Sequence, residues 1–435
     1  MRRLWNFQRV GDELGSPPAP DEVVDAFLGS YGLYVHIPFC RSICPYCPYN
    51  KVLYRDELVP GYFAALEREL RLYEADRRSF TSLYVGGGTP SLCLGELGDA
   101  LSGIRVEGER AIELFPTHVT PETVARLHEL GFTHVSLGVQ SFDERMLRHL
   151  GRLNTAGDNR RALAASVGSF ACVNADLIFD VVVGDPAVFL RDFEACCRSG
   201  VDQISTYPLM HFGFTPSGKA THAPRAEHEL LRRAGEVADR LGYERRSVWT
   251  FNRVGGPLYA SIARELYLGT GAGAATFTGR DFLVNHFGLE QYAAALAAGR
   301  LPIARRVRLD AVEAALYCAF WQLYAPGLDL DRFRRLFPGA RWIAPLCGVL
   351  TRTGHLTRRD GRVRLTQKGF DRYHDAERWV TYHLIEPLWG EMLEEHAGFT
   401  PGSVVAADGG DRRAQHDEGR WPTRRSSRGT PATRS

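Results

Sequence analysis

Six short β-rich runs alternate with amphipathic helical stretches between residues 31 and 209, and this alternation limits the fold more than any other feature of the chain. The segment that begins at Pro121 is typical of the helices, because Thr120 can cap it and proline occupies its first position. Alternating strands and helices favour a parallel α/β sheet, closed or partly closed as a barrel. The ligands of such a sheet bind at the carboxyl ends of its strands, where the connecting loops converge. The six predicted strands are 31–37, 82–87, 110–116, 133–139, 172–183 and 202–209.

The chain of 435 residues, 44% of them hydrophobic, is long enough for one large domain and one smaller one. After about residue 305 the pattern changes to helices, followed by a helix with a small β-wing. The segment beyond residue 402 has almost no apolar periodicity, so burial cannot offset the entropy of ordering it. We therefore predict an N-terminal extension, a barrel with its own extension, a helical or winged-helix-like domain and a disordered tail, at 1–30, 31–304, 305–402 and 403–435.

The charge and cysteine content restrict the partners and the compartment. The formal net charge is +2 and the basic residues are scattered, so nothing points to nucleic acid as a partner. Nine cysteines, two of them adjacent at Cys196 and Cys197, do not make a disulfide framework and suit a reducing compartment. No uninterrupted apolar run reaches the roughly 18 residues of a membrane span, and the first residues lack the apolar core of a signal peptide. We expect a soluble cytoplasmic protein.

Three cysteines follow the first predicted strand directly, with the spacing C-x3-C-x2-C at Cys40, Cys44 and Cys47. Thiolates are suitable ligands for iron and sulfur, and three of them leave one iron of a cuboidal [4Fe–4S] cluster open to a chelating small molecule. The alternatives are a zinc site that takes His36 as its fourth ligand, or three unrelated cysteines on one loop. The spacing resembles the signature of the radical S-adenosylmethionine (SAM) superfamily, which implies that the open iron is chelated by SAM. Tyr46 matches the position that packs against the adenine ring in that superfamily.

Polar and glycine positions at other strand ends support this interpretation. A glycine run, Gly86 to Gly88, is followed by Thr89 and Pro90 at the end of the second strand, where backbone groups can approach a ligand closely. It resembles the superfamily element that binds the SAM amino group, although a glycine run is also common in simple turns. Three polar residues lie on otherwise apolar strands and are predicted to face one cavity, unless they only form internal hydrogen bonds: Glu113, Gln140 and Asp176.

Five stretches of the chain resemble the oxygen-independent coproporphyrinogen III oxidase-like (HemN-like) family, and they occur in the same order as in that family. They are YVHIPFC, GGGTPS, LGVQSFDERMLRHLGR, DLIF and YLGTGAGAATFTGRDFLVNHFGLEQY, and the likeness covers roughly residues 31 to 375. The resemblance implies a partial (β/α)6 barrel of the radical SAM type and two bound SAM molecules, one on the cluster and one beside it. The family's SAM-binding positions fall on Tyr34, Tyr46, Gly87, Gly88, Thr89, Glu113, Gln140, Arg152, Asp176, Pro208 and Ala275.

The chain departs from the family at three places. Tyr49 occupies a position where the oxidase has a further cysteine, which argues against porphyrinogen decarboxylation. The heme-binding stretch of the heme chaperones is missing before the glycine-rich segment. Asp180, Val181 and Val182 replace a Gly-Leu-Pro sequence, so we expect a reshaped loop over the site.

Three functions of the family stay open. The leading prediction is a transferase that uses the second SAM as the carbon donor for methylation or cyclopropanation of an sp2 carbon in a small planar substrate, with flavodoxin or ferredoxin as electron donor. The second is oxidative decarboxylation of a tetrapyrrole, and the third is a heme-binding chaperone.

The histidines near the motifs receive no catalytic role. Four residues are candidates for lining a substrate pocket: Tyr207, Trp249, Asn285 and Tyr292.

Overall fold

The computed structural model describes residues 8–9, 17–180, 184–218, 224–257, 266–324, 327–359 and 361–395. All six predicted strands are present, and each is paired in parallel with the next one along the chain. Their bounds are β2 (Gly32–Ile37), β6 (Leu83–Gly87), β8 (Arg110–Leu114), β9 (His134–Gln140), β10 (Cys172–Phe179) and β11 (Gln203–Pro208).

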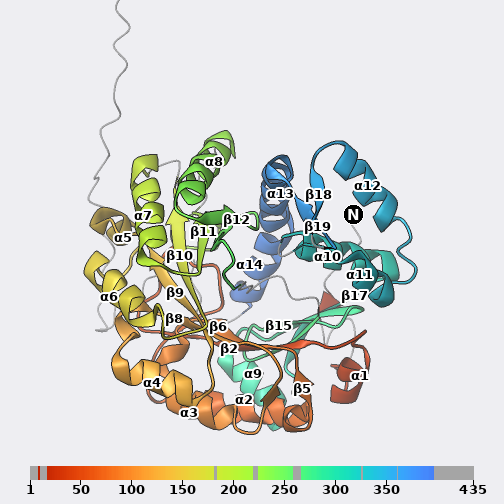
Figure 1. Ribbon diagram of the computed structural model, residues 1–435. Coiled ribbons are helices and arrows are strands. Elements are labelled where there is room, and N and C mark those ends of the chain that lie inside the picture. Colours follow the sequence, from red (N-terminus) through yellow and green to blue (C-terminus); the bar gives the residue numbers. More distant parts are fainter. Residues whose placement is uncertain are drawn as a thin grey trace, which may run out of the picture.

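The helices between these strands cover one face of the sheet, on the outer side of its curve (Figure 1). The predicted cap of α4 is present, because the Thr120 hydroxyl accepts a hydrogen bond from the Thr123 N–H at 3.2 Å. The helices between the six strands are α2 (Val59–Leu72), α3 (Leu94–Ala100), α4 (Pro121–Glu129), α5 (Glu144–His149), α6 (Ala156–Ser166) and α7 (Pro186–Ser199), and α8 (Pro224–Arg240) follows β11. Short 3-10 helices lie at Ala75–Arg77, Pro90–Leu92 and Pro116–His118.

The two faces of the parallel sheet differ in chemistry because successive side chains of a strand point to opposite faces. On β2, Leu33, Val35 and Ile37 are buried in the core that includes helix α2. The alternate residues, beginning with Tyr34, form the other face, and lateral pairing extends that face across the sheet. The second face therefore carries polar side chains, and the C-terminal helices lie on its side (Figure 1).

The sheet extends beyond the six predicted strands at both edges. On one side β14 is a seventh parallel strand next to β2, followed by antiparallel strands, and on the other side β13 and β12 are antiparallel. Within the described residues the edge strands β1 and β12 do not pair with each other, so the barrel is partial and open. The added strands are β14 (Tyr267–Thr270), β15 (Ala275–Phe277), β16 (Asp281–Asn285), β17 (Ile303–Arg308), β1 (Gln8–Arg9), β13 (Thr250–Arg253) and β12 (Tyr243–Arg245), with helices α1 (Pro20–Asp25) and α9 (Leu289–Ala297), and the pairs β3 (Phe39–Cys40) with β4 (Val52–Leu53) and β5 (Ser79–Phe80) with β7 (Arg105–Val106).

The C-terminal region is helical with a two-stranded wing, as the sequence pattern predicts. Its core is continuous with the edge of the sheet, since Phe277 and Val307 of the sheet pack with Phe333 and Val363 of this region. The predicted domain boundary between residues 304 and 305 therefore stays a prediction. The predicted disordered tail, 403–435, lies outside the described residues. The elements are α10 (Ala311–Tyr324), α11 (Leu330–Leu336), α12 (Ile343–Arg352), β18 (Leu356–Arg359), β19 (Arg362–Leu365), α13 (Gln367–Val380), a π-helix (Thr381–Ile385) and α14 (Glu386–Glu394).

None of the helices that the structure describes combines the length and the apolar character that crossing a bilayer requires.

Candidate active site

The loop that carries the three cysteines starts at the carboxyl end of β2 and is held at its far end by Asn50. The buried Asn50 side-chain amide donates to the carbonyl oxygens of Ala272 at 3.0 Å and Phe287 at 2.9 Å. Its own carbonyl oxygen accepts a hydrogen bond from His36 Nε2 at 2.9 Å. The loop is thus fixed to β2 and to the glycine-rich segment that follows β14.

The three thiols are free and partly buried, and they interact electrostatically with one another. The Thr89 hydroxyl lies 3.6 Å from Cys40 Sγ, and Arg152 Nη1 lies 3.7 Å from Cys44 Sγ. Burial raises the pKa of the Cys40 thiol to about 12 and also raises that of Cys47, so these thiols stay protonated until a metal replaces the proton. Free thiols beside two hydrogen-bond donors suit an iron–sulfur cluster.

The alternative zinc site with His36 is wrong. His36 Nδ1 accepts from the Tyr34 hydroxyl at 2.8 Å while Nε2 donates to Asn50, so neither ring nitrogen is available as a ligand. In the described part of the chain, no three His, Cys, Asp or Glu side chains converge closely enough to hold a single metal ion. A cuboidal cluster does not need such convergence, because each cysteine binds a different iron atom.

The glycine run at the end of β6 is required by contacts with β2 and with the start of the cysteine loop. Gly87 has a φ of +113°, and a Cβ there would lie 2.5 Å from the His36 ring. A Cβ on Gly88 would lie 2.6 Å from the Phe39 carbonyl oxygen. The Thr89 N–H donates to that same oxygen at 2.7 Å, so the run and the cysteine loop form one rigid unit.

Glu113 and Asp176, two of the three predicted polar residues, lie on the polar face of the sheet. Glu113 accepts hydrogen bonds from the Tyr84 hydroxyl and, at 3.1 Å, from the Gly87 N–H. Asp176 accepts from the Ser136 hydroxyl at 2.7 Å and from the Asn174 amide at 2.9 Å. Burial raises the pKa of Glu113 to about 7 and that of Asp176 to about 6, although these hydrogen bonds favour the ionised forms.

Arg152 joins the cysteine loop to the end of β9. Its Nη2 donates to the Gly138 carbonyl oxygen at 2.7 Å and its Nε to Asn154 Oδ1 at 3.2 Å, while its guanidinium lies 4.3 Å from the Phe115 ring centre. Gln140 reaches the same place, since a Cβ on Gly138 would be 3.1 Å from Gln140 Nε2 and 3.3 Å from Arg152 Nη2. Gln140 has a φ of +64°, an unusual value for a residue other than glycine.

The other four predicted positions surround this group. Tyr34 stacks on Tyr84 on the polar face, with ring centres 6.0 Å apart. Tyr46 packs near Leu150, Ile178 and Leu209 and lies beside Arg152 and Cys44. Pro208 pairs with Phe179 where β10 and β11 end, and Ala275 faces Gly269 of β14, the strand next to β2. All fourteen predicted metal and SAM positions thus lie along the polar face, its strand ends or the adjoining loops.

Three of the four pocket candidates belong to the core instead. Asn285 and Tyr292 both donate hydrogen bonds to Glu69, at 2.7 and 2.6 Å, and Tyr292 is fully buried. Trp249 Nε1 donates to His374 Nδ1 at 2.8 Å in a second buried network. Of the four, Tyr207 is partly exposed and lies within electrostatic reach of Asp176.

Glu69 is a position that supports the site and that the sequence analysis missed. It is fully buried on α2 and also accepts the Gly271 N–H at 2.7 Å, so it anchors the glycine-rich segment that carries Ala275. Burial raises its pKa to about 7, although three hydrogen bonds favour the ionised form. In the sequence, Glu69 looks like an ordinary helical charge, and only its position between apolar residues of α2 could have indicated burial.

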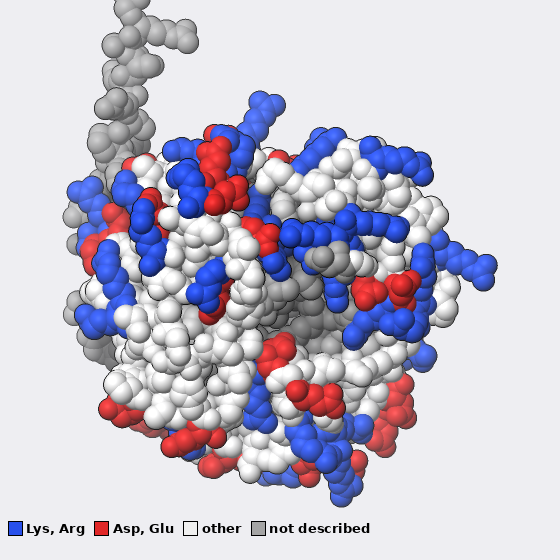
Figure 2. Space-filling model, in the orientation of Figure 1, with Lys and Arg blue, Asp and Glu red and all other residues white. Residues whose placement is uncertain are grey.

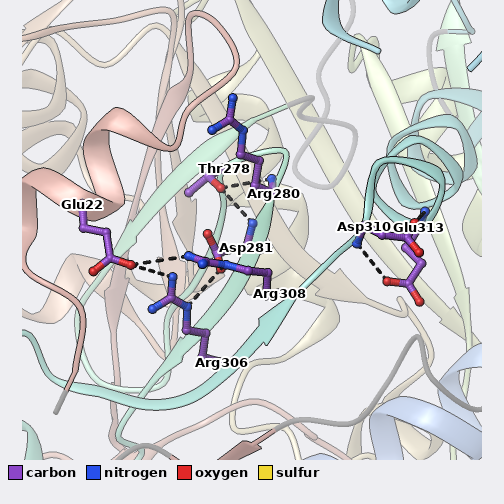
Figure 3. Close-up of polar contacts among 8 residues, drawn as sticks. All are labelled: Glu22, Thr278, Arg280, Asp281, Arg306, Arg308, Asp310 and Glu313. Atoms are coloured by element: carbon purple, nitrogen blue, oxygen red, sulfur yellow. Dashed lines mark hydrogen bonds and ion pairs between the residues drawn. The ribbon is translucent and has the colours of Figure 1, made fainter. Parts of the chain in front are cut away.

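The molecule is hollowed between the sheet and the C-terminal region, on the face shown in Figure 2. A second hollow of about 750 Å³ lies elsewhere, between α1, β17 and α11. Two of its carboxylates are paired: Asp281 contacts Arg308 at 3.1 Å and the neighbouring Arg306 at 3.0 Å, and both arginines reach Glu22 (Figure 3). Because these four charges are already paired with one another, they are not free to bind a ligand.

Comparison with known proteins agrees with this geometry. A sequence family described as the radical SAM superfamily matches residues 34–195. The oxygen-independent coproporphyrinogen III oxidase of Pseudomonas aeruginosa is 32% identical over 231 residues, which cover 48% of this chain and 50% of that protein. The chain thus spans half the length of this relative. The heme chaperone HemW of Mycobacterium tuberculosis is 31% identical over 308 residues, covering 65% of this chain and 78% of the chaperone.

Among solved structures, the coproporphyrinogen III oxidase (HemN) of Escherichia coli, a radical SAM enzyme, matches with a TM-score of 0.69. The match covers 85% of this chain and 93% of that one, at 21% sequence identity. Identity this low establishes a shared fold rather than a shared reaction.

Proposed function

The chain belongs to the oxygen-independent coproporphyrinogen III oxidase-like (HemN-like) family of the radical SAM superfamily, and on this premise we propose that it transfers a carbon unit from SAM to an sp2 carbon of a small planar substrate. Membership of the superfamily implies a [4Fe–4S] cluster and SAM. When bound, the cluster and SAM supply a 5′-deoxyadenosyl radical, and the protein contributes orientation, exclusion of water and electrostatics. The carbon unit would be added by methylation or cyclopropanation.

In this proposal the thiolates of Cys40, Cys44 and Cys47 hold the cluster. The first SAM would lie beside the cluster, at the contact between the cysteine loop and the glycine run, where Thr89 bonds to Cys40 and Gly87 bonds to Glu113. Glu113 would accept hydrogen bonds from an ammonium or hydroxyl group of that SAM. Tyr34, Gly88 and Tyr46 complete this first position.

The observation that carries the use of a second SAM is the pair of separate carboxyl groups, Glu113 and Asp176, on one face of the sheet. They come from β8 and β10, each has its own polar partners, and the charge of Asp176 raises the pKa of Glu113. Each can accept hydrogen bonds from a cationic ligand, and two neighbouring sulfonium ligands would lower the repulsion between the two carboxylates. The second position is assigned to Gln140, Arg152, Asp176, Pro208 and Ala275.

A second candidate function is oxidative decarboxylation of a tetrapyrrole, or heme binding. It is favoured by the names of two relatives, a coproporphyrinogen III oxidase and a heme chaperone. A heme-related partner would fit this candidate. Tyr49, in place of the further cysteine of the oxidase, argues against it, and we expect poor or no activity on coproporphyrinogen III. Efficient conversion to protoporphyrinogen would promote this candidate over carbon transfer.

The deciding experiment follows the fate of methyl-labelled SAM in the anaerobically reconstituted enzyme, supplied with flavodoxin or ferredoxin as reductant. Carbon transfer should release 5′-deoxyadenosine and S-adenosylhomocysteine in comparable amounts and place the label in the product. Decarboxylation should release 5′-deoxyadenosine and methionine without S-adenosylhomocysteine, and a heme chaperone should bind heme without sustained SAM consumption. Either of the last two outcomes would overturn the proposal.

A further inference from the structure

Helix α13 of the C-terminal region carries a buried carboxyl group that no interaction within the described residues accounts for. Glu377 is 5% exposed, and its Oε2 has no hydrogen-bond partner in the part of the chain that the structure describes. The adjacent Arg378 does not satisfy it, because that guanidinium bonds to Glu227 of α8. Burial raises the pKa of Glu377 well above its usual range, with Arg378 opposing the shift. An unsatisfied buried carboxyl group is costly, which suggests that a ligand completes it.

Glu377 faces the same space as the cysteine loop. The link is Tyr49, which lies within electrostatic reach of Glu113, Cys47, Asp176 and Glu377. Tyr49 is nevertheless 58% exposed. A side chain that is open to solvent and yet surrounded by these groups lines a cavity. The carboxyl groups of the sheet and that of α13 therefore lie on different sides of one cavity.

Aromatic side chains form the wall between them. Tyr207 at the end of β11 is within electrostatic reach of Asp176, Tyr324 and Tyr49, and Glu377 raises the pKa of the buried Tyr324. Tyr207 and Tyr324 both pack against Trp249, with ring centres 5.9 and 6.1 Å away. Such a wall suits a flat substrate. Glu377 comes from α13 of the C-terminal region, whereas the cysteine loop follows β2 of the sheet.

The charges in this cavity select the kind of group that Glu377 can bind. Glu113, Asp176 and Glu377 are three carboxyl groups, whereas the cations of this region already bond to protein oxygen atoms: Arg152 to Gly138, Arg245 to Val248 and Arg378 to Glu227. The ionised form of Glu377 would repel a substrate carboxylate, whereas a cationic nitrogen-bound hydrogen would satisfy Oε2 and favour that ionised form against the effect of burial.

We propose that Glu377 is a substrate-recognition residue, and that the substrate presents an amine, amidine or heterocyclic N–H to its carboxyl group. This inference rests on the proposed function and narrows its substrate class to planar molecules with a nitrogen-bound hydrogen. It also makes the C-terminal region a part of the active site.

The test uses benzamidine as a planar N–H donor, with benzoate and benzyl alcohol as matched rings that carry an anion and a hydroxyl. Each is titrated by NMR into the reconstituted holoenzyme under saturating SAM, so that the SAM-binding carboxyl groups are occupied. Benzamidine should bind the wild-type protein best, and Glu377→Gln should weaken it about tenfold or more, the effect of losing one charge-assisted hydrogen bond. Glu394→Gln, which removes an exposed charge from α14, should leave the affinity unchanged.

Preference for benzoate or benzyl alcohol in the wild-type protein would overturn the inference, and this comparison does not depend on any variant folding. Equal binding of benzamidine to wild type and Glu377→Gln would overturn it as well. Iron content should be unchanged in Glu377→Gln, and a loss of iron would show that Glu377 serves the cluster instead. Because binding is measured without turnover, failure here is distinct from failure of carbon transfer.

Discussion

The Glu69 network makes a quantitative prediction about stability. In Glu69→Gln, the amide oxygen can take the place of Oε2 and accept from Gly271 and Tyr292, but the amide nitrogen then faces the Asn285 amide at a distance of 2.7 Å. One buried donor loses its acceptor, which costs about 1–3 kcal/mol. We therefore expect Glu69→Gln to be destabilised by about that amount at pH 5.

The sign of the pH dependence follows from the raised pKa of Glu69. Its folded-state pKa is about 7, against a usual value of 4.5. A raised carboxyl pKa means that stability is present at low pH and is lost as the pH rises from 4.5 through 7, by about 3 kcal/mol in total. The Glu69→Gln variant has no such loss, because glutamine does not titrate. The difference in the free energy of unfolding between the wild type and this variant should therefore shrink or reverse by pH 8.

Urea denaturation of the holoprotein under anaerobic conditions at pH 5, 6, 7 and 8 measures both effects. Glu67→Gln is the matched control, because Glu67 is two residues away on α2 and forms a surface pair with Arg71. It should change the free energy of unfolding by less than about 0.5 kcal/mol at every pH. If Glu69→Gln kept the same pH slope as wild type, the carboxyl group would not be buried as the structure has it and the reasoning would fail.

Three further predictions concern the cluster, SAM and the C-terminal region. Arg152→Lys should weaken SAM binding and cleavage roughly tenfold, since an ammonium cannot reproduce the planar fork of a guanidinium; unchanged SAM use with a lower melting temperature would remove Arg152 from the site. Cys40→Ala should abolish the cluster, seen as loss of iron and of its absorption, whereas Cys347→Ala should keep it; equal loss in both would refute the assignment. Glu227→Ala should destabilise the fold by about 3–5 kcal/mol in denaturant, because it removes the carboxylate from the buried Arg378; a change below about 0.5 kcal/mol would show that this ion pair does not hold α13 to α8.

Much of the fold could be predicted because the relevant patterns are local. The six parallel strands follow from short apolar runs separated by helical periodicity, and the Thr120 cap follows from a residue type at one position. The cysteine loop is equally local, since its three thiols lie within eight residues directly after β2. Glu113 and Asp176 stood out as polar residues on apolar strands, and they lie on the polar face because side chains alternate along a strand.

What the tertiary structure decided depends on contacts between residues far apart in the chain. Glu69 became an anchor only when α2 met a segment two hundred positions away, and Asn285 and Tyr292 joined it in the core rather than lining the pocket. Glu377 gained its significance because α13 lies near the cysteine loop, which no pattern around residue 377 indicates. Periodicity reports which side of an element is buried, whereas the identity of the partner across the interface is set by how the elements pack.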